Sequence, residues 1–452
     1  MKKALLFPLL LGLSGCATFM TETPDAPAGM LVASGIPADP SFALNSDDAG
    51  SMVLAYAEGS RILAQKYGAD GVPVWGVPGI VIASGTAEVR GVVLDRGTGG
   101  WYAAWKEKEA LGWRVKARWF SDAGEAVWES PALAGMLASG HYPLDYTAMA
   151  DGSMVLAYND RNRVTQSIFL GLSRIMPDGK VSWTREMGTV SPGAWYQSPK
   201  MDWDEGEGFY LSYRKIDQGD RGLVMQRLSG SGEPLWPETL DIYDAGGYKS
   251  PALMFSDRHG GVIMAWEDGR SGAMDVYAQR VSSSGALLWR PEGLAIGWGD
   301  GNQWDPVMCP DGLGGAYVAW VDEARTFPWN VKVQHLSGQG EITYPPAGLP
   351  AVVSVEHQSH PMIAMDGANG AVVCWYEARG SDYGIYCQRV GPKDGVLWGP
   401  AGVTVTDSND QKTGWSMSAD GKGGVVVAWK SRINDSWEIR ARRVDQAGQV
   451  TW

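Results

Sequence analysis

Residues 257–289 read DRHGGVIMAWEDGRSGAMDVYAQRVSSSGALLW, and one complete structural unit is visible in and around them. Short apolar or alternating segments are separated by turns rich in Gly, Asp and Ser, and no segment has the period of a helix. The pattern predicts four strands, at residues 250–256, 262–267, 275–281 and 286–296. Strands joined by turns this tight pair antiparallel, so the unit is one four-stranded antiparallel sheet.

The sequence of this unit repeats eight times along the chain. A small residue followed by an aromatic marks each copy, at Ala55-Tyr56, Ala104-Trp105, Ala157-Tyr158, Ser212-Tyr213, Ala265-Trp266, Ala319-Trp320, Cys374-Trp375 and Ala428-Trp429. A second aromatic series follows at Trp75, Trp128, Trp183, Trp236, Trp289, Tyr344, Trp398 and Trp452. Self-similarity at steps of 49 to 55 residues is typical of repeat architectures. Four-stranded repeats of this length predict an all-β fold, an eight-bladed β-propeller.

The two ends of the repeat array complement each other. The eighth copy stops at Trp452, without the apolar half-strand that follows the second aromatic elsewhere, such as residues 79–85. A matching segment stands before the first copy at residues 29–35. We therefore expect the N-terminal strand to complete the eighth blade and close the ring, which leaves no open sheet edge.

The first residues predict export. Lys2 and Lys3 precede an apolar run that is too short to span a bilayer, which is typical of a signal peptide. Leu13-Ser14-Gly15-Cys16 resembles the lipobox of bacterial lipoproteins, and this resemblance implies cleavage before Cys16 and acylation of its thiol. An ordinary signal peptide with an incidental Cys is the alternative. We expect a signal peptide at 1–15, an acylated Cys and tether at 16–28, and a propeller at 29–452, anchored in the bacterial cell envelope at the outer membrane.

The charge and composition of the chain exclude some classes of binding partner. The formal net charge of −13 argues against nucleic acid and against an anionic membrane surface, so membrane contact is expected through the lipid anchor only. A hydrophobic content of 44% is enough to bury a core. We expect a monomer that takes no cofactor.

One repeat motif carries a family resemblance. Asp275-Val276-Tyr277-Ala278-Gln279-Arg280, followed by Gly285 and Trp289, resembles the repeat of quinoprotein-type propellers, in which a Gly and a later Trp dock neighbouring blades. That superfamily includes the propeller lipoprotein of the outer-membrane barrel-assembly machinery. The Gly-Gly-x-x-x-Ala-Trp-x-Asp-x-Arg run also resembles repeats of secreted bacterial propellers. The resemblance covers all eight repeats and implies the architecture.

Local catalytic motifs are missing from the sequence. The Asp that recurs once per copy (Asp48, Asp95, Asp151, Asp204, Asp257, Asp311, Asp366 and Asp420) is interpreted as a turn residue that bonds its own backbone. His357 and His360 form the only close His pair, without the further ligands that zinc requires, so no metal site is predicted. A quinone-dependent dehydrogenase would need metal ligands and a cofactor cavity that the sequence does not locate.

The loops that enter the innermost strands carry the candidate binding residues. In a propeller these loops surround the mouth of the central channel, and here they mix aromatic with polar side chains. The candidates are Tyr142, Trp195, Tyr196, Gln197, Tyr248, Gln303, Trp304, His357, His360 and Trp415. Such a set suits a glycan or a peptide, although aromatic wedges between blades would look the same in sequence.

The sequence favours a non-catalytic binding or assembly module whose partner is an envelope protein or a glycan. The alternative is a carbohydrate-active enzyme, a glycoside hydrolase or lyase, with its site at the channel mouth. An enzyme would need convergent carboxylates with perturbed pKa values at that mouth, whereas a binding module would not.

Cys374 and Cys387 are predicted to face each other. Counting back from a tight turn at Gly380-Ser381 makes them direct cross-strand partners, at positions that are Ala265 and Ala278 in the fifth copy. Antiparallel partners lie within disulfide range and an exported protein meets oxidising conditions. The alternative is two small buried thiols.

Overall fold

The structure is a computed structural model of the chain. It describes residues 29–452 apart from 48, 98, 111, 129–131, 138–143, 162–167, 188–194, 207, 218–219, 243–246, 324–327, 380–381 and 407–410. The predicted signal peptide, Cys16 and the tether therefore lie outside the described residues. Within the described ranges the secondary structure is β-strand and turn without a helix, so the all-β prediction is confirmed. No helix among the described residues is long and apolar enough to cross a membrane.

The strands of the first half follow the sequence repeats. Repeat 1 contains β2 (Phe42–Ser46), β3 (Met52–Glu58), β4 (Arg61–Tyr67) and β5 (Ile80–Ala83). Repeat 2 contains β6 (Val89–Gly97), β7 (Gly100–Glu109), β8 (Gly112–Ser121) and β9 (Ala132–Leu137). Repeat 3 contains β10 (Leu144–Ala148), β11 (Met154–Arg161), β12 (Ile168–Ile175) and β13 (Val181–Met187). Repeat 4 contains β14 (Trp195–Trp203), β15 (Gly208–Asp217), β16 (Asp220–Ser229) and β17 (Leu240–Asp241).

The second half continues the same order. Repeat 5 contains β18 (Leu253–Ser256), β19 (Gly261–Asp268), β20 (Asp275–Ser282) and β21 (Leu294–Gly297). Repeat 6 contains β22 (Asn302–Pro310), β23 (Ala316–Glu323), β24 (Asn330–Leu336) and β25 (Leu349–Pro350). Repeat 7 contains β26 (Gln358–Met365), β27 (Ala371–Arg379), β28 (Asp382–Gly391), β29 (Gly395–Val396) and β30 (Val403–Thr406). Repeat 8 contains β31 (Gln411–Ala419), β32 (Val425–Ile433) and β33 (Ser436–Val444).

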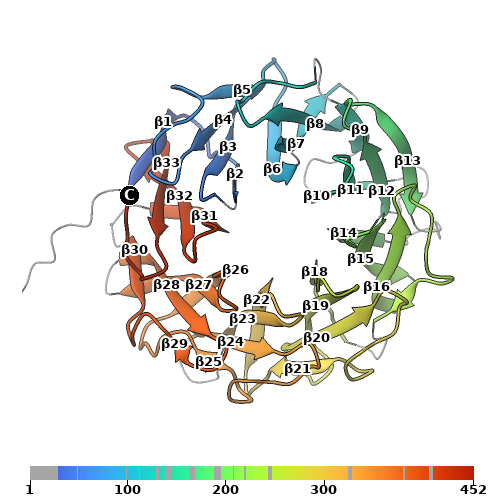
Figure 1. Cartoon of the computed structure of the whole chain (residues 1–452), viewed down its shortest axis with the longest axis vertical. Helices are drawn as coiled ribbons and strands as arrows, with labels where there is room; N and C mark the ends of the chain where they lie inside the picture. The colour runs from blue at the N-terminus through green and yellow to red at the C-terminus, as the bar shows by residue number, and fades with distance from the viewer. Residues whose placement is uncertain are drawn as a thin grey trace, which may run out of the picture.

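The sheets stand around a common axis, as in a β-propeller. Figure 1 shows the first strand of each repeat nearest the centre and the later strands towards the outside. In repeat 5 the second and third strands match the predicted ones to within one residue, whereas the first starts at Leu253 rather than at residue 250 and the fourth at Leu294 rather than at residue 286. Among the described residues, repeats 3 and 4 share one eight-stranded sheet, because Ile168 of β12 bridges Trp195 of β14.

The N-terminal strand β1 (Met30–Ile36) lies in the sheet of repeat 8. It pairs antiparallel with β33, with Met30 opposite Ala441 and Ile36 opposite Trp437, in a sheet ordered β1-β33-β32-β31. Figure 1 marks the C-terminus beside β1. Segments from the two ends of the chain thus share one sheet.

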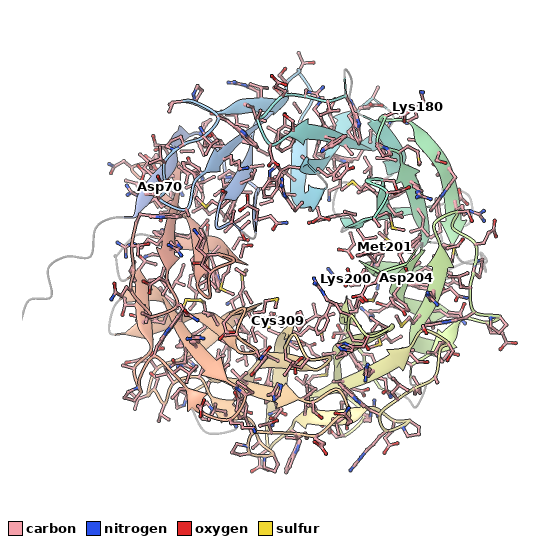
Figure 2. The ribbon with its side chains drawn as sticks, in the orientation of Figure 1. Asp70, Lys180, Lys200, Met201, Asp204 and Cys309 are labelled. Atoms are coloured by element: carbon pink, nitrogen blue, oxygen red, sulfur yellow. A yellow bond between two sulfur atoms is a disulfide. The ribbon has the colours of Figure 1, made fainter. Side chains whose placement is uncertain are left out.

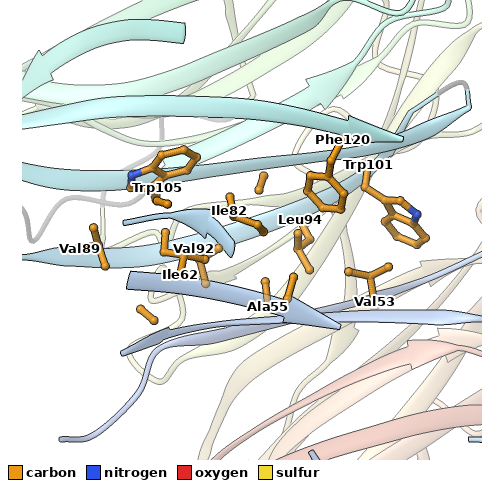
Figure 3. Packing of buried hydrophobic residues seen from close by; sticks show 14 residues of the cluster. Val53, Ala55, Ile62, Ile82, Val89, Val92, Leu94, Trp101, Trp105 and Phe120 are labelled. Atoms are coloured by element: carbon orange, nitrogen blue, oxygen red, sulfur yellow. The ribbon is translucent and has the colours of Figure 1, made fainter. Parts of the chain in front are cut away.

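The apolar core lies between neighbouring repeats rather than inside any one of them. Side chains of repeats 1 and 2 form one such cluster, in which Val53, Ile62 and Leu94 face Trp101 and Trp105 (Figure 3). Trp105, like Trp266, Trp320 and Trp375 of the same aromatic series, is fully buried. Strands that are apolar on both faces are needed because each sheet is covered on both sides.

The second aromatic series ties each repeat to the next. Each of these side chains donates a hydrogen bond to a backbone carbonyl at the end of strand three, or in the turn after it, in the following repeat. The donor and acceptor pairs are Trp75 to Asp122, Trp128 to Pro177, Trp183 to Gly230, Trp236 to Ser283, Trp289 to Gly338, Tyr344 to Gly391, Trp398 to Gln446 and Trp452 to Ala69. A side chain that fills the gap between two sheets also satisfies its one polar group there.

The turn interpretation of the recurrent Asp is confirmed at six positions and is wrong at one. Carboxylates accept backbone N–H groups of their own turns at Asp151, Asp204, Asp257, Asp311, Asp366 and Asp420. Asp95 instead lies within the innermost strand β6. Asp48 lies outside the described residues, and its neighbour Asp47 accepts the turn bonds from Ala49 and Ser51.

Candidate functional site

The candidate site lies on the face of the ring at which the innermost strands begin, here named the start face. Because strands one and two of a repeat are antiparallel, the beginning of the first and the end of the second meet on this face. The residue after the first aromatic of each repeat stands near the end of strand two. These residues are Ala57, Lys106, Asn159, Arg214, Glu267, Val321, Tyr376 and Lys430.

A β-bulge recurs at the beginning of the innermost strand. The register shifts between Arg90 and Val93, between Gln197 and Lys200, between Trp304 and Val307, and between Ser359 and Met362. Each bulge contains one residue in the left-handed region: Gly91 (φ 62°), Ser198 (φ 56°), Asp305 (φ 55°) and His360 (φ 50°). Bulges re-aim side chains, and left-handed non-Gly residues cluster at functional sites. The shared conformation therefore singles out Ser198, Asp305 and His360.

Two of these bulges are held by the preceding repeat. The backbone N–H of Asp305 donates to Glu267 Oε1 at 2.7 Å, and that of Ser198 donates to Asn159 Oδ1 at 3.0 Å. Glu267 and Asn159 each follow the first aromatic of their repeat. Equivalent hydrogen bonds therefore hold both bulges. The strained backbone is thus fixed by a specific partner on β19 or β11.

Glu267, Asp305 and His360 form a group of titratable side chains on β19, β22 and β26. Burial raises the pKa of Glu267, and the charge of Asp305 raises it further, whereas the hydrogen bond from the Asp305 N–H lowers it. Burial also raises the pKa of Asp305, and the charge of His360 opposes that rise. Asp305 thus interacts electrostatically with Glu267 in the preceding repeat and with His360 in the following one, and titratable groups with shifted pKa values are candidates for acid–base chemistry.

Two sets of aromatic contacts involve residues next to this group in the chain. Trp304 and Trp329 meet edge to face with ring centroids 5.3 Å apart, and Trp329 meets His357 at 5.0 Å. In the second set, the ring centroids of His360 and Tyr376 lie 5.9 Å apart, and those of Tyr376 and Trp415 lie 5.7 Å apart. Sequence analysis did not select Trp329 and Tyr376 as candidates. Tyr376 follows the first aromatic of its repeat, and that recurrent position was the available signal.

The structure divides the ten predicted candidates. Trp195 and Tyr248 are exposed, at 44% and 41%, and the Arg214 guanidinium lies 5.0 Å from the Tyr248 ring centroid. Gln197, Trp304 and His357 are half-buried and His360 is exposed. Tyr142 lies outside the described residues.

Three of the predicted contact residues are buried instead. Tyr196 packs in the core beside Tyr213, and Trp415 is 8% exposed and contacts Tyr376. Gln303 is fully buried and donates to Asp322 at 2.8 Å. The first residues of an innermost strand alternate between the face and the gap between repeats, so part of each loop motif turns inwards.

A second set of carboxyl groups joins neighbouring repeats along the inner wall. Asp145 accepts the N–H of Met201 at 2.6 Å, and Asp202 accepts the N–H of Ser256 at 2.5 Å. Burial raises the pKa of both, and it raises the pKa of Asp95 to about 7. Lys200 lies 3.6 Å from Asp145, and Figure 2 shows it at the inner rim of the ring. Because these carboxyls bond the backbone of the next repeat, they act as structural links.

A metal site has no support in the part of the chain that the structure covers. No group of three or more His, Cys, Asp or Glu side chains there could hold a metal ion. His357 instead accepts the N–H of Trp329 at 3.2 Å, and His360 contacts the Ser359 hydroxyl at 3.1 Å.

Cys374 and Cys387 are directly opposite on β27 and β28 and form a disulfide. The remaining cysteine of the described residues, Cys309, is a buried thiol.

Comparison with known proteins identifies the fold. No protein-family model and no curated protein matches the chain. Among solved structures, a prolyl endopeptidase from an analysis of two such enzymes is 11% identical, with 89% of this chain and 54% of that one covered at a TM-score of 0.50. Prolyl oligopeptidase B from Galerina marginata, bound to a 25mer macrocyclization substrate, is 12% identical over 88% and 56% of the two chains, with a TM-score of 0.46.

A third structure is the β-propeller domain of the Trilobed protease from Pyrococcus furiosus. It is 9% identical over 79% of this chain and 92% of that one, with a TM-score of 0.46. The chain spans just over half the length of the prolyl peptidases that it matches. At these identities the similarity shows the fold alone, and the chain is a β-propeller.

The expected non-catalytic binding or assembly module is corrected by these findings. The finding against it is the likeness to a prolyl endopeptidase at a TM-score of 0.50, of which this chain covers 54%. Burial raises the pKa of Glu267 and Asp305 on the start face, as it does for the linking carboxyls Asp145 and Asp202.

Proposed function

We propose that the protein is a hydrolase that acts on peptides at the start face, with Glu267, Asp305 and His360 as its acid–base groups. The observation that carries the proposal is the bond from the Asp305 N–H to Glu267, which fixes a left-handed Asp between two titratable partners. The peptidases among the similar structures agree with this class of reaction.

The proposed roles follow from the surroundings of each group. Asp305, beside His360, acts as the carboxylate base that takes a proton from water. Glu267, in its protonated form, gives a proton to the leaving amine as the C–N bond breaks. The water oxygen then ends on the carbonyl carbon, so the products are a carboxylic acid and an amine. His360 stabilises the charge of Asp305.

The flanking aromatic rings would hold the substrate on either side of these groups. Trp304 with Trp329 and His357 offers one stacking surface, and the exposed His360 with Tyr376 offers the other. Aromatic and proline side chains of an extended peptide pack well on such rings. Peptides with those residues near the cleaved bond are therefore the preferred substrates.

The test is cleavage of a fluorogenic peptide library by the purified protein. Glu267→Gln and Asp305→Asn should each lower kcat/KM by 100-fold or more, in line with general acid–base catalysis. Asp178→Asn, a matched change in an exposed turn between strands three and four, should leave the rate unchanged. Equal activity of Glu267→Gln and wild type, or no cleavage by wild type, would overturn the proposal.

We also propose that the eight repeats are eight four-stranded blades of a closed ring. The count is supported by the eight aromatic hydrogen bonds, the last of which returns from Trp452 to Ala69. Closure is supported by the pairing of β1 with β33.

We further propose that the protein works in the bacterial cell envelope, anchored by an acylated Cys16 in the outer membrane. The Leu13-Ser14-Gly15-Cys16 motif supports this location. Cys16→Ala should release the protein from the membrane fraction, and mass spectrometry of the mature N-terminus should find the lipid on Cys16. A membrane-bound Cys16→Ala variant would contradict the anchor.

A further inference from the structure

A cavity of about 550 Å³ opens on the start face between repeats 8, 1 and 2. Its lining includes Ser41, Ala57, Arg90, Lys106 and Lys430. This volume falls within the range of small-ligand sites. Figure 1 places these repeats across the ring axis from repeats 5 and 6, which carry Glu267 and Asp305.

The cavity lies where the side chain at one recurrent position of the repeats is unusually small. The residue after the first aromatic is Lys430 in repeat 8, Ala57 in repeat 1 and Lys106 in repeat 2. Ala57 is the smallest of the eight residues at this position, and both of its neighbours in the ring are lysines. A methyl group therefore leaves space, and two ammonium groups border it.

Lys106 has an unusual environment for a cation. Its side chain is 7% exposed, and it stands directly opposite Arg90 in the pairing of β6 with β7. Burial lowers the pKa of Lys106, and the charge of Arg90 lowers it further. Like charges placed opposite each other on one face are destabilising. An anion between the two side chains would relieve both the repulsion and the desolvation.

The bulge of repeat 2 makes room for this arrangement. Repeats 6 and 7 have Asp305 and His360 at the left-handed position, whereas repeat 2 has Gly91. A Cβ atom on Gly91 would lie 3.0 Å from Cε of Lys106. The missing side chain thus lets the lysine lie across the bulge.

The nearby acids leave an excess of positive charge. Asp39 pairs with Lys430 and is 57% exposed, while Glu88 pairs with Arg90 at 2.5 Å. Three cations against two carboxylates give a net charge of +1 in a chain whose total is −13. Ser41 adds a buried hydroxyl that makes no hydrogen bond to any described residue. A donor without a partner beside cations suits an oxygen anion.

We propose that this cavity binds a carboxylate of the peptide substrate, either the C-terminal group or an acidic side chain, through Lys106, Arg90 and Ser41. The assignment to a peptide rests on the proposed function, because the cavity and the acid–base group share the start face. An anchored carboxylate on one side of the ring would present the chain to the groups on the other. The protein would then favour substrates that carry a negative charge at a fixed distance from the cleaved bond.

The test is isothermal titration of the full chain carrying Glu267→Gln with four probes. These are an N-acetylated tripeptide with a free C-terminal carboxylate, its C-terminal amide, the amide with an internal Glu, and inorganic phosphate. The free acid should bind at least tenfold more tightly than the amide, as expected for loss of a charge-assisted bond. Tight binding of the internal-Glu amide would support the proposal and identify the side chain as the source.

Two variants probe the cavity itself. Lys106→Met should remove the difference between acid and amide, and Ala57→Leu should do so by filling the space without changing the charge. Lys180→Met, an exposed lysine of a turn in repeat 3, is the matched control and should change nothing. Lys106→Met should also raise the melting temperature of the free protein, because a desolvated charge is removed.

Equal binding of acid and amide, or an unchanged difference in folded Lys106→Met, would overturn the proposal. Phosphate that binds as tightly as the peptide acid would also overturn it, since the cavity would then hold an inorganic anion. These readouts need no cleavage. A protein that binds the acid selectively but cuts no peptide would therefore disprove the hydrolase while leaving the carboxylate site standing.

Discussion

The indole Nε1 of Trp452 donates a hydrogen bond to the carbonyl oxygen of Ala69 at 3.1 Å, although the two residues are 383 positions apart. The same bond joins Trp75 to Asp122 across 47 positions. A Cβ atom on Gly71 would lie 3.1 Å from the Trp452 ring, and one on Gly124 would lie 3.0 Å from Trp75. The contact between the ends of the chain is thus the same contact that joins consecutive repeats.

Trp452→Ala should lower the free energy of unfolding by about 2–4 kcal/mol, because it removes a large packed side chain and its hydrogen bond. Urea unfolding followed by far-UV circular dichroism measures the change. Trp298→Ala is the control, since that side chain is 50% exposed, and it should cost less than about 1 kcal/mol. Equal losses in the two variants would contradict a special role for the end-to-end contact.

Asp95→Asn should change how stability depends on pH. The pKa of Asp95 is raised to about 7 in the folded protein by burial, against an ordinary value of 3.8. The folded state therefore holds this proton more tightly than the unfolded state, and wild type loses stability as pH rises from about 4 through 7.

The Asn side chain keeps an oxygen for the Arg96 N–H and has no proton to lose. The variant should be more stable than wild type by about 1–3 kcal/mol at pH 8, and the difference should vanish near pH 4. Chemical denaturation at the two pH values measures it. Asp70→Asn, on the outside of the ring in Figure 2, is the control, and a constant difference at both pH values would count against the assignment.

Reduction of the Cys374–Cys387 disulfide should destabilise wild type by about 1–3 kcal/mol, at the lower end for a short loop within a hairpin. The double variant Cys374→Ala with Cys387→Ala restores the Ala265–Ala278 pair found in repeat 5, so it should fold and show no response to reductant. Melting curves with and without dithiothreitol decide the matter. A wild-type melting temperature that is the same with and without the reductant would show that the disulfide contributes nothing to stability.

Three tryptophans of the candidate loops should separate into two classes. Trp415→Ala should cost about 3 kcal/mol of stability because that ring is buried against Tyr376. Trp195→Ala should leave the melting temperature within a few degrees. Trp304→Ala should keep the fold and raise KM for peptides, since its ring forms part of the stacking surface. Melting temperature and peptide kinetics on the same three variants test the division.

Much of the fold could be read from the sequence because its signals are local. The alternation along residues 275–281 and the turn at Ser282 to Gly285 specify strands and hairpins within one repeat. The opposition of Cys374 and Cys387 follows from counting residues across one turn. The pairing of β1 with β33 was expected because the first and last copies are incomplete in complementary ways.

The candidate site was harder to predict because it depends on contacts between repeats. A bulge shifts the register by one residue. The Trp304-Asp305-Pro306 motif alone does not predict that Asp305 adopts a left-handed backbone conformation or that its N–H bonds to Glu267. Asp95 has the spacing of a turn residue, yet its strand continues through it. Gln303 and Trp304 are adjacent in sequence. Their side chains point to opposite faces of the strand, so the first is buried and the second is half-buried.

The sheet shared by β1 and β33 also sets a schedule for biosynthesis. About 400 residues separate the two strands, so at about 5–20 residues per second a ribosome needs roughly 20–80 s to deliver β33 after β1. During that interval β1 has no strand to pair with, and the first repeat has an uncovered apolar flank. Chaperones bind nascent chains with such exposed apolar surface. Slowly translated codons near the 3′ end of the mRNA would prolong the time for which this surface is exposed.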